Sequence, residues 1–487
     1  MNAELKLKTL TPCEIAETVG GVIYKIGKAN GNEKVSSVST SSSEVFPGAM
    51  FCAIKGERVD GADFIPEAVS LGAVCVLTTH VPDEARTGNW CAIVVDDVVK
   101  ALGTLSGWYR DFSSAKFVAI TGSVGKTTTK GFVYAVASSV YKTHKTKGNH
   151  NNELGLPMTL FELEPDDKVS VIELGMSNLG EIEYMSLLVK PDIAVITNIG
   201  TSHLASLGTR ENICLAKLEI CAGLKKEKGI ILLNADEPLL FEKVSELPYD
   251  VRLMSIKNRL GDYRAMNIRQ EDDGITFDMI CDNKAITNVE IPVLGTHNVY
   301  NALTAYAVGT ILGLSESDIR RGLLSFEGEA MRQRIYDIGC LTVIDDCYNA
   351  SPESMRAAID VLVGTAAKRG KRPIALIGDM LELGDYSRLL HDQIGQYAAQ
   401  ANVAKLFCYG LMSDIVAEAA IKKGIRAENV FVCLDTRDPQ TIADMICNTA
   451  QPGDILLVKA SRGVHAERVI ECLKKKITKM KQPKDNG

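Results

Sequence analysis

The sequence lacks any uninterrupted apolar run long enough to span a bilayer, and its opening stretch, MNAELKLKTLTP, contains no apolar core of a signal peptide. We therefore expect a cytoplasmic protein without membrane insertion. An excess of positive charge is also missing, because 54 Lys and Arg face 61 Asp and Glu, for a formal net charge of -7. A nucleic-acid partner held by a basic field is therefore not expected.

Paired cysteine motifs are absent too. The 13 cysteines are scattered and odd in number, and no two of them form a C-x-x-C pair. This pattern favours reduced thiols over a disulfide framework or a zinc site. We find no internal repeat and no low-complexity stretch. The 487 residues exceed what one core accommodates, so the length predicts about three domains. We expect a monomer.

The stretch from Phe117 to Lys130, FVAITGSVGKTTTK, is the one around which the chain is organised. A short apolar strand leads into a small-residue loop, and a helix-compatible stretch starts at Lys126. Loop N–H groups and the helix N-terminus would face an anion, Lys126 would add positive charge, and the Thr127 hydroxyl can ligate Mg²⁺. The candidate nucleotide-binding residues here are Gly122, Ser123, Gly125, Lys126, Thr127 and Thr128.

This loop departs from the strict P-loop pattern G-x-x-x-x-G-K-[ST], which requires glycine where Ile120 stands. A chance Gly-Lys-Thr in a strand-to-helix turn is the alternative. The strand context, both glycines and the Lys-Thr pair together favour a phosphate cradle.

Three further side chains lie where a nucleotide site could use them. Glu173 ends a buried strand, and a carboxylate there is well placed for Mg²⁺, although a surface ion pair would be favoured without the phosphate loop. His203 follows another buried strand, so metal or phosphate contact competes with an ordinary structural role. Lys217 lies on a helix expected over 211–224, where a solvated lysine is equally compatible with the pattern.

Amide side chains gather in two segments. Residues 148–152, GNHNN, suit a polar ligand but equally a plain turn. Asn298 and Asn301 share one face at the start of an Ala-rich helix, where they could contact a base edge or merely cap and pack.

Strands alternate with helices along the chain, which predicts an α/β protein. We divide it into residues 1–112, 113–320 and 321–487. In the last unit the alternation predicts a parallel, doubly wound, Rossmann-like sheet, with one strand ending at Asp345 and Asp346.

Seven segments, spread over essentially the whole chain, resemble motifs of the Mur ligases, which join amino acids or peptides to a UDP-sugar carboxylate. They are TGSVGKTTTK at 121–130, GNHNNELGLPMTLF at 148–161, ELGMS at 173–177, GTHNVYNALTA at 295–305, DDCYNASPESM at 345–355, GDMLELG at 378–384 and KASRGVHAE at 459–467. The YNASP, GDMLELG and SRG segments are most similar to members that add D-alanyl-D-alanine to UDP-MurNAc-tripeptide.

The resemblance implies three domains around a central P-loop-type ATPase domain with a parallel-rich sheet. Residues 1–112 would bind the UDP-sugar, 113–320 would bind ATP, and 321–487 would bind the incoming D-Ala-D-Ala. The implied activity is an ATP-dependent, ADP-forming peptide ligase of peptidoglycan precursor synthesis, and hence a role in cell-wall biogenesis, cell shape and cell division.

Residue roles follow from the same resemblance. Thr127 and Glu173 would hold Mg²⁺, and His203 would hold a second Mg²⁺. Lys217 matches a position that several Mur ligases carbamylate, which would make it a metal ligand. Asn298 matches the adenine-side asparagine and Asp346 the ribose-side carboxylate. The implied catalytic residues are Lys126, His203, Lys217 and Arg332, the last matching an arginine that reaches the ATP phosphates from the third domain.

The first unit departs from the family pattern. Where the family shows Ser-Thr-Asp-Ser-Arg, this chain has Ser41 and Ser43 at the acidic and basic positions, and Ala62 ends the Asp-Gly-His-like triplet. Losing an arginine weakens the case for ordinary diphosphate recognition. A ligase acting on a different nucleotide-linked or peptide carboxylate therefore stays open. A catalytically silent scaffold or a generic P-loop NTPase explains the motifs less well.

Overall fold

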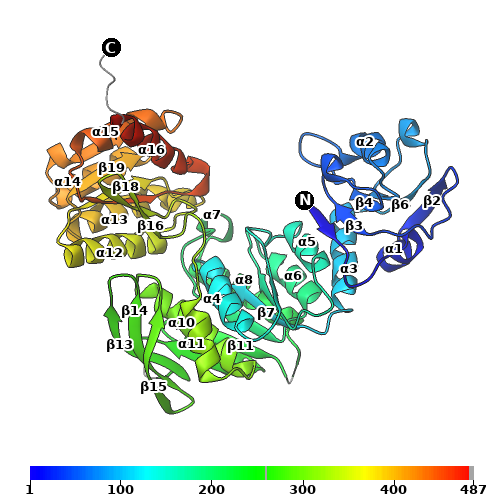
Figure 1. Cartoon of the computed structure of the whole chain (residues 1–487), viewed down its shortest axis with the longest axis horizontal. Coiled ribbons are helices and arrows are strands. Elements are labelled where there is room, and N and C mark those ends of the chain that lie inside the picture. The colour runs from blue at the N-terminus through cyan, green and yellow to red at the C-terminus, as the bar shows by residue number, and fades with distance from the viewer. Residues whose placement is uncertain (227, 258–259, 482–487) are drawn as a thin grey trace.

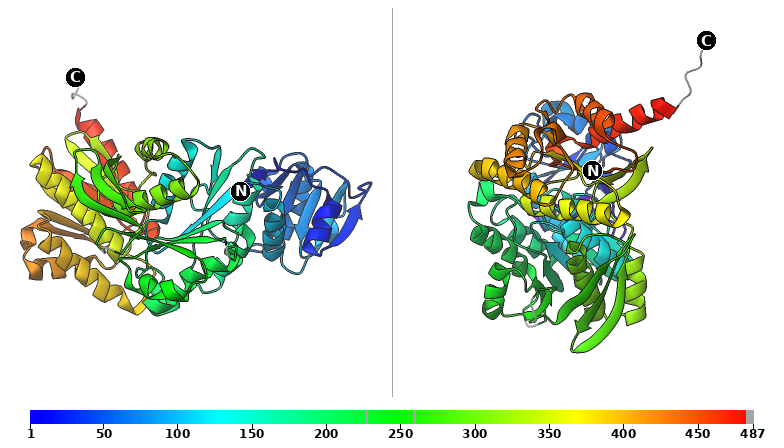
Figure 2. Two further views of the ribbon diagram at one scale, coloured as in Figure 1. Left: turned by 90° about the horizontal axis from the view of Figure 1, so that it is seen from below. Right: turned by 90° about the vertical axis from the view of Figure 1, so that its left-hand side faces the viewer.

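The computed structural model describes residues 1–226, 228–257 and 260–481 and has three α/β domains, each built on one sheet. The first domain lies at one end of the molecule, and the third lies against the second (Figures 1 and 2). The predicted three-domain α/β architecture is confirmed. No helix in these described ranges is both long enough and apolar enough to cross a membrane.

The first domain has a six-stranded sheet in the order β1-β3-β4-β5-β6-β2, parallel from β3 to β6 with antiparallel edges. Its first helix begins with a capping box formed by Thr11 and Glu14, and Pro12 takes the first helical position. The strands are β1 Asn2–Glu4, β2 Val22–Ile26, β3 Ser37–Ser39, β4 Ala49–Cys52, β5 Cys75–Thr78 and β6 Trp90–Val94. The helices are α1 Pro12–Val19, α2 Ile65–Ser70 and α3 Val98–Arg110. The last of these packs on α5 and α6 of the second domain.

The second domain has a nine-stranded sheet in the order β15-β14-β13-β12-β11-β10-β7-β9-β8. Its strands are β7 Lys116–Thr121, β8 Thr143–Lys145, β9 Val169–Glu173, β10 Ile193–Ile196, β11 Ile230–Asn234, β12 Asp250–Ser255, β13 Tyr263–Gln270, β14 Ile275–Cys281 and β15 Lys284–Ile291. Its helices are α4 Lys126–Ser138, α5 Gly155–Phe161, α6 Glu181–Val189, α7 Leu204–Leu207, α8 Arg210–Leu218, α9 Pro238–Lys243, α10 His297–Ile311 and α11 Glu316–Leu324. The phosphate loop joins the central strand β7 to α4.

Two features of this domain differ from the expectation. Strands β13, β14 and β15 form an antiparallel meander, because their alternating exposed and buried residues suit a one-sided sheet rather than a doubly covered one. The helix expected over 211–224 stops being α-helical at Leu218 and continues as a 3₁₀ turn, Glu219–Gly223.

The third domain has a six-stranded sheet in the order β16-β17-β21-β18-β19-β20. It is parallel apart from the edge strand β16, as the predicted doubly wound fold requires. The strands are β16 Arg334–Ile338, β17 Leu341–Asp345, β18 Pro373–Gly378, β19 Lys405–Tyr409, β20 Val430–Cys433 and β21 Ile455–Lys459. The helices are α12 Pro352–Arg369, α13 Ser387–Gln400, α14 Ser413–Lys423, α15 Pro439–Thr449 and α16 Glu467–Lys481. Residues 482–487 of the unit proposed above lie outside the described ranges.

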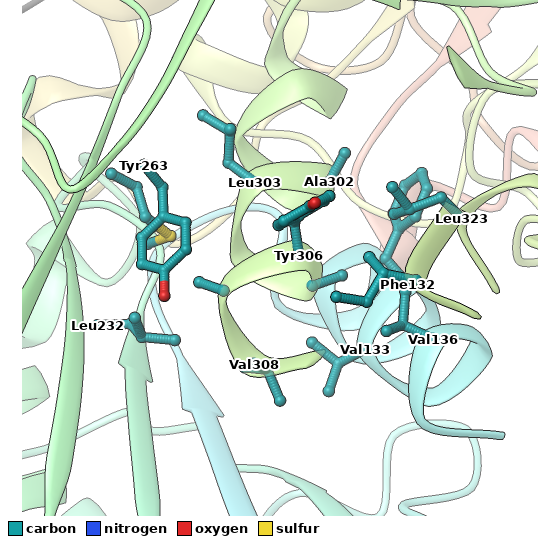
Figure 3. Close-up of a cluster of buried hydrophobic side chains, with 14 of the residues drawn as sticks. Phe132, Val133, Val136, Leu232, Tyr263, Ala302, Leu303, Tyr306, Val308 and Leu323 are labelled. Atoms are coloured by element: carbon teal, nitrogen blue, oxygen red, sulfur yellow. The ribbon is translucent and has the colours of Figure 1, made fainter. Parts of the chain in front are cut away.

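The largest core lies between the central sheet and helices α4, α10 and α11 (Figure 3). Phe132 of α4 is fully buried and stacks on Phe326, with ring centroids 3.8 Å apart. Phe326 begins the segment that leads into the third domain. The core under the phosphate-loop helix therefore also anchors the connection between the second and third domains.

Substituting Phe132→Ala should destabilise the second domain by about 3–5 kcal/mol, because it leaves a cavity and removes the stacking partner of Phe326. Urea unfolding followed by circular dichroism should show the loss as a lower transition midpoint. Leu324→Ala is the control, since Leu324 is 51% exposed on the neighbouring helix α11. Equal midpoints for the two variants would contradict the assignment of Phe132 to the core.

Candidate active site

The loop between β7 and α4 has the backbone geometry of an anion cradle. Gly125 has a φ of 82° and precedes the first turn of α4, whose N–H groups stay available to a ligand. Gly122 has a φ of 149°, and a Cβ there would lie 1.9 Å from Thr197 Oγ1. Both glycines are therefore required, whereas Ile120, at the position of the first glycine of the strict pattern, is a fully buried residue of strand β7.

The segment after β10 holds this loop in place. The N–H of Ser123 donates to Asn198 O at 3.2 Å, and the N–H of Val124 donates to Asn198 Oδ1 at 3.1 Å. The N–H of Gly200 in turn donates to Ser123 Oγ at 2.8 Å. The position of the phosphate loop thus depends on the conformation of residues 197–200.

The ammonium group of Lys126 lies at the loop itself. Its Nζ donates to Gly122 O at 2.8 Å and to Ser123 O at 3.4 Å. Burial lowers the pKa of Lys126, although Glu173 acts in the opposite direction. The side chain is therefore a positive charge already folded over the cradle.

Glu173, at the end of β9, is the centre of a buried polar cluster. Its Oε1 accepts from Asn151 Nδ2 at 2.9 Å and from Thr127 Oγ1 at 3.2 Å, and Lys130 Nζ lies 3.2 Å from Oε2. Burial raises the pKa of Glu173, but the cations Lys130, Lys126 and Arg332 outweigh it, so that the pKa lies below its ordinary value. Glu173 is thus an anion at neutral pH.

Thr127 and Glu173 fit the donor set of a magnesium ion. Both supply hard oxygen ligands, and their oxygens are 3.2 Å apart. Adjacent ligands of an octahedral ion with bonds of about 2.1 Å lie roughly 3 Å apart, so the observed spacing matches. Among the described residues there is no group of three or more His, Cys, Asp or Glu side chains that could hold a metal. Magnesium here would have to complete its shell from water and phosphate oxygens.

A chain of amides ties α10 to the phosphate-loop helix. Thr129 Oγ1 donates to Asn301 Oδ1 at 2.8 Å, and Asn301 Nδ2 donates to Asn298 Oδ1 at 2.8 Å. Asn298 Nδ2 donates to Leu294 O at 2.7 Å. Asn301 therefore serves as the bridge between two binding elements, while Asn298 lies at the edge of the cavity.

The third domain contributes two charged groups. The Arg332 guanidinium stacks over the Tyr348 ring at 4.1 Å, a cation–π contact. Asp346 pairs with Lys459, whose Nζ lies 2.6 Å from Oδ2, and accepts from the Gln333 N–H at 3.2 Å. Arg332 and Asp346 are thus both fixed by their own domain.

A cavity of about 1200 Å³ lies between the second and third domains and collects most of the predicted site. The predicted residues that line it are Ser123, Gly125, Lys126, Thr127, Thr128, Glu173, Asn298, Arg332 and Asp346. Gly122, His203 and Lys217 are not part of its lining. This volume is of the size that holds a nucleotide-sized ligand.

His203 lies beside this cavity and contacts the third domain. It has a φ of 66°, and its Nδ1 is 3.0 Å from Glu382 Oε2. The hydrogen bond from His203 lowers the pKa of Glu382, more than burial raises it. His203 therefore joins the two domains in this arrangement rather than projecting freely at a strand end.

Lys217 lies deep in α8 and is 1% exposed. Burial, with a smaller contribution from Lys126, lowers its pKa well below 10.5. In the part of the chain that the structure describes, no hydrogen bond or ion pair to its Nζ is found. Burial without a charged partner favours the neutral amine, which is the nucleophilic form of a lysine.

Three residues of the site were missed in the sequence interpretation. Lys130 and Lys459 are buried partners of Glu173 and Asp346, and Tyr348 supports Arg332. Lys130 follows Lys126 by four residues, about one helical turn. This spacing could have predicted that both lysines lie on the same face of the helix. Lys459 and Tyr348 lie beside their partners only because of the order of the strands in the sheet. A local sequence pattern does not predict that order.

The departing residues of the first domain form ordinary turns. Ser41 Oγ and Ser43 Oγ are 3.0 Å apart, and Asp60 Oδ1 accepts from the N–H of Ala62, which is fully buried. None of the three lines the cavity between the second and third domains.

Three family models match the chain in sequence order. The Mur ligase family, catalytic domain model covers residues 34–109, the Mur ligase middle domain model covers 120–309, and the Mur ligase, glutamate ligase domain model covers 331–462. The matched regions include the phosphate loop, Glu173, Asn298, Arg332 and Asp346.

Named relatives match over nearly the whole length. The UDP-N-acetylmuramoyl-tripeptide--D-alanyl-D-alanine ligase of Bacillus subtilis (strain 168) is 37% identical over 90% of this chain and 93% of that protein. The crystal structure I of MurF from Acinetobacter baumannii has a TM-score of 0.86 at 30% identity, covering 97% of this chain and 100% of that one. MurF ligase from Thermotoga maritima in complex with ADP has a TM-score of 0.79 at 28% identity, covering 91% and 98%.

The affinity for ADP should fall as the pH rises, starting below 10.5, because burial lowers the pKa of Lys126 and the charged form exists only below that pKa. Calorimetric titration between about pH 7 and pH 10 would measure the decline. Lys126→Arg is the matched variant, since arginine keeps its charge and should bind ADP with a flat alkaline profile. Identical profiles for both proteins would show that Lys126 does not carry the pH dependence.

Proposed function

The chain belongs to the Mur ligase family, and from this we propose that it joins D-alanyl-D-alanine to UDP-MurNAc-tripeptide at the expense of ATP. The products are UDP-MurNAc-pentapeptide, ADP and phosphate. The reaction belongs to peptidoglycan precursor synthesis, so that cell-wall biogenesis, cell shape and cell division depend on it.

One observation carries this proposal. The cavity between the second and third domains combines a phosphate cradle and Glu173 from one domain with Arg332 and Asp346 from the other. A nucleotide bound there would be held from both sides. We assign residues 1–112 to the UDP-sugar, 113–320 to ATP and 321–487 to the incoming dipeptide.

The first chemical step needs an activated carboxylate. A carboxylate oxygen of the tripeptide attacks the γ-phosphorus of ATP, and the bond to the β,γ-bridging oxygen breaks. ADP is the leaving group, and the tripeptide becomes an acyl phosphate. Two anions must approach, so cations and fixed dipoles are required at the transferring group. Lys126, the N–H groups of the first turn of α4 and Arg332 supply them. Magnesium, held by Thr127 and Glu173, would neutralise phosphate charge.

The second step forms the peptide bond. The free amine of D-Ala-D-Ala attacks the acyl carbon, phosphate leaves with the bonding electrons, and the amine loses a proton. Water would hydrolyse the same intermediate, so the two domains have to exclude it while the amine enters. The GDMLELG loop, which carries Glu382 to His203, is part of that closure.

The remaining roles follow from position. Asn298 is proposed on the adenine side and Asp346 on the ribose side, both at the wall of the cavity. Lys217 is proposed to be carbamylated, because burial favours its neutral amine, which can add CO₂ and lose a proton to become an anionic carbamate. That anion, with His203, is the proposed holder of a second magnesium ion.

A different carboxylate substrate is the second candidate. Ser41, Ser43 and Ala62 favour it, because they replace charged and hydrogen-bonding residues in the domain assigned to the UDP-sugar. A silent scaffold is disfavoured, since the cradle, Glu173 and Lys217 are intact.

We expect the protein to act as a monomer in the cytoplasm, where ATP is available. In that compartment the 13 cysteines would stay reduced. We expect no nucleic-acid partner at a net charge of -7.

Phosphate release from ATP should require both UDP-MurNAc-tripeptide and D-Ala-D-Ala, because the acyl phosphate needs the carboxylate and its breakdown needs the amine. Colorimetric phosphate detection, with mass spectrometry of the product, measures this. Lys126→Met is the control and should release none. Turnover with another nucleotide-linked carboxylate in place of the tripeptide would instead establish the second candidate.

Intact-mass spectrometry under non-acidic conditions should find one CO₂ on Lys217 that acid removes. Lys217→Arg should lack this mass and lose most ligase activity, since arginine cannot form the carbamate. Arg321→Lys is a control for unspecific modification, because it places a lysine on helix α11 at a position where the side chain is 58% exposed. An unmodified Lys217 in the active enzyme would contradict the assigned role.

A further inference from the structure

Helix α12 lies along the boundary between the third domain and the second, above β14 and α10 (Figure 1). Both of its ends contact the second domain. At its N-terminus Glu353 reaches the loop after β10, and at its C-terminus Lys368 and Arg369 reach the turn between β13 and β14. The first contact is to a loop of the active site, and the second is to an exposed turn.

The contact of Glu353 is a set of three hydrogen bonds to one residue. Glu353 Oε1 accepts from the Thr201 N–H at 3.0 Å and from Thr201 Oγ1 at 3.0 Å, and Oε2 is 3.3 Å from the same hydroxyl. The carboxylate also packs against Gly200, where a Cβ would lie 3.0 Å from its Cδ. Hydrogen bonds to a charged acceptor are about twice as strong as neutral ones.

Thr201 lies between two parts of the active site. Immediately before it, the N–H of Gly200 donates to Ser123 Oγ in the phosphate loop at 2.8 Å. Two residues after it, His203 meets Glu382 of the third domain at 3.0 Å. A group that fixes Thr201 therefore fixes both the support of the phosphate loop and the position of His203.

The position of the Glu353 carboxylate is unusual for electrostatic reasons. Glu353 lines the cavity assigned to a polyanion, where an added negative charge opposes ligand binding. Its charge is offset by the N–H and hydroxyl of Thr201 and by the N-terminus of α12, on which Glu353 is in the first turn. A carboxylate in this cavity is tolerated because it binds the loop across the domain boundary.

We infer that Glu353 is a positioning residue that orders the Gly200–His203 loop when the third domain closes on the second. Closure brings the carboxylate to Thr201, and the loop then holds Ser123 and His203 in their reactive places. The inference rests on the proposed function in one respect, that the closed arrangement is the reactive one. It assigns to Glu353 no contact with substrate.

The opposite end of α12 provides the matched control. Lys368 Nζ lies 3.3 Å from Asp272 Oδ1, and Arg369 Nη2 lies 3.7 Å from Asp273 Oδ1. Asp272 and Asp273 are 75% and 96% exposed, so these pairs contribute little and are screened by salt. They join the same helix to the same domain without touching the catalytic loop.

The experiment compares Glu353→Gln with Lys368→Ala in the full-length protein, because Lys368, unlike Arg369, does not line the cavity. Glu353→Gln should lower kcat by about tenfold to a hundredfold, the loss expected for hydrogen bonds to a charged group, while the Kd for ADP stays within about twofold. Glu353→Asp should recover part of the rate. Lys368→Ala, at the other end of the helix, should keep kcat and change only the salt dependence of closure.

Small-angle X-ray scattering with ADP and Mg²⁺ gives a readout that needs no ligase substrate. Wild type should become more compact on adding the nucleotide, and Glu353→Gln should compact less. If wild type compacts but makes no pentapeptide, the proposed function fails while this comparison still tests Glu353.

A double-variant cycle separates positioning from other roles. Thr201→Val removes the hydroxyl partner of Glu353 but keeps the backbone N–H partner, so it should lower kcat less than Glu353→Gln does, and the double variant should lose no more than Glu353→Gln alone. Additive losses would overturn the inference, as would a Glu353→Gln variant with wild-type kcat and compaction. A shifted magnesium activation curve with normal compaction would also overturn it, because Glu353 would then act on the metal.

Discussion

Repulsion between anions is the constraint on which the arrangement of this protein depends. The proposed reaction brings a substrate carboxylate to a polyphosphate, inside a cleft where water screens charge poorly. The net charge of the protein is -7, so its overall charge does not attract these anions. Positive groups fixed at the site offset the repulsion instead. Lys126, the N-terminus of α4 and Arg332 converge on one cavity. Two of the carboxylates placed there, Glu173 and Asp346, are each paired with a buried lysine.

Splitting the cations between two domains has a physical purpose. A cleft that held every cation permanently would bind product as well as substrate. Here Arg332 and Asp346 belong to the third domain, while the cradle and Glu173 belong to the second. Each side is rigid by itself, through the Tyr348 stack and the Asn301 bridge respectively. Relative movement of the two domains can therefore assemble the site without disturbing either half.

Much of this was predictable from the sequence, because local chemistry carries it. The strand-glycine-lysine-helix stretch predicted the cradle, and strand ends pointed to Glu173 and Asp346. The meander β13–β15 was not predicted, since alternating half-exposed strands give a weak signal beside apolar parallel strands. The pairs Lys459–Asp346 and Glu353–Thr201 join residues more than a hundred positions apart. Only the order of strands in the sheets and the packing of domains bring them together.

Because α12 is long, a small rotation of the third domain moves one end of this helix over a large distance. Its 18 residues span about 27 Å at 1.5 Å per residue. A rotation of the third domain by about 10° about a point near the C-terminal end of α12 would displace the N-terminal end of the helix by roughly 5 Å, more than the reach of a hydrogen bond. A small angular motion of the third domain is thereby converted into an all-or-none contact at the catalytic loop.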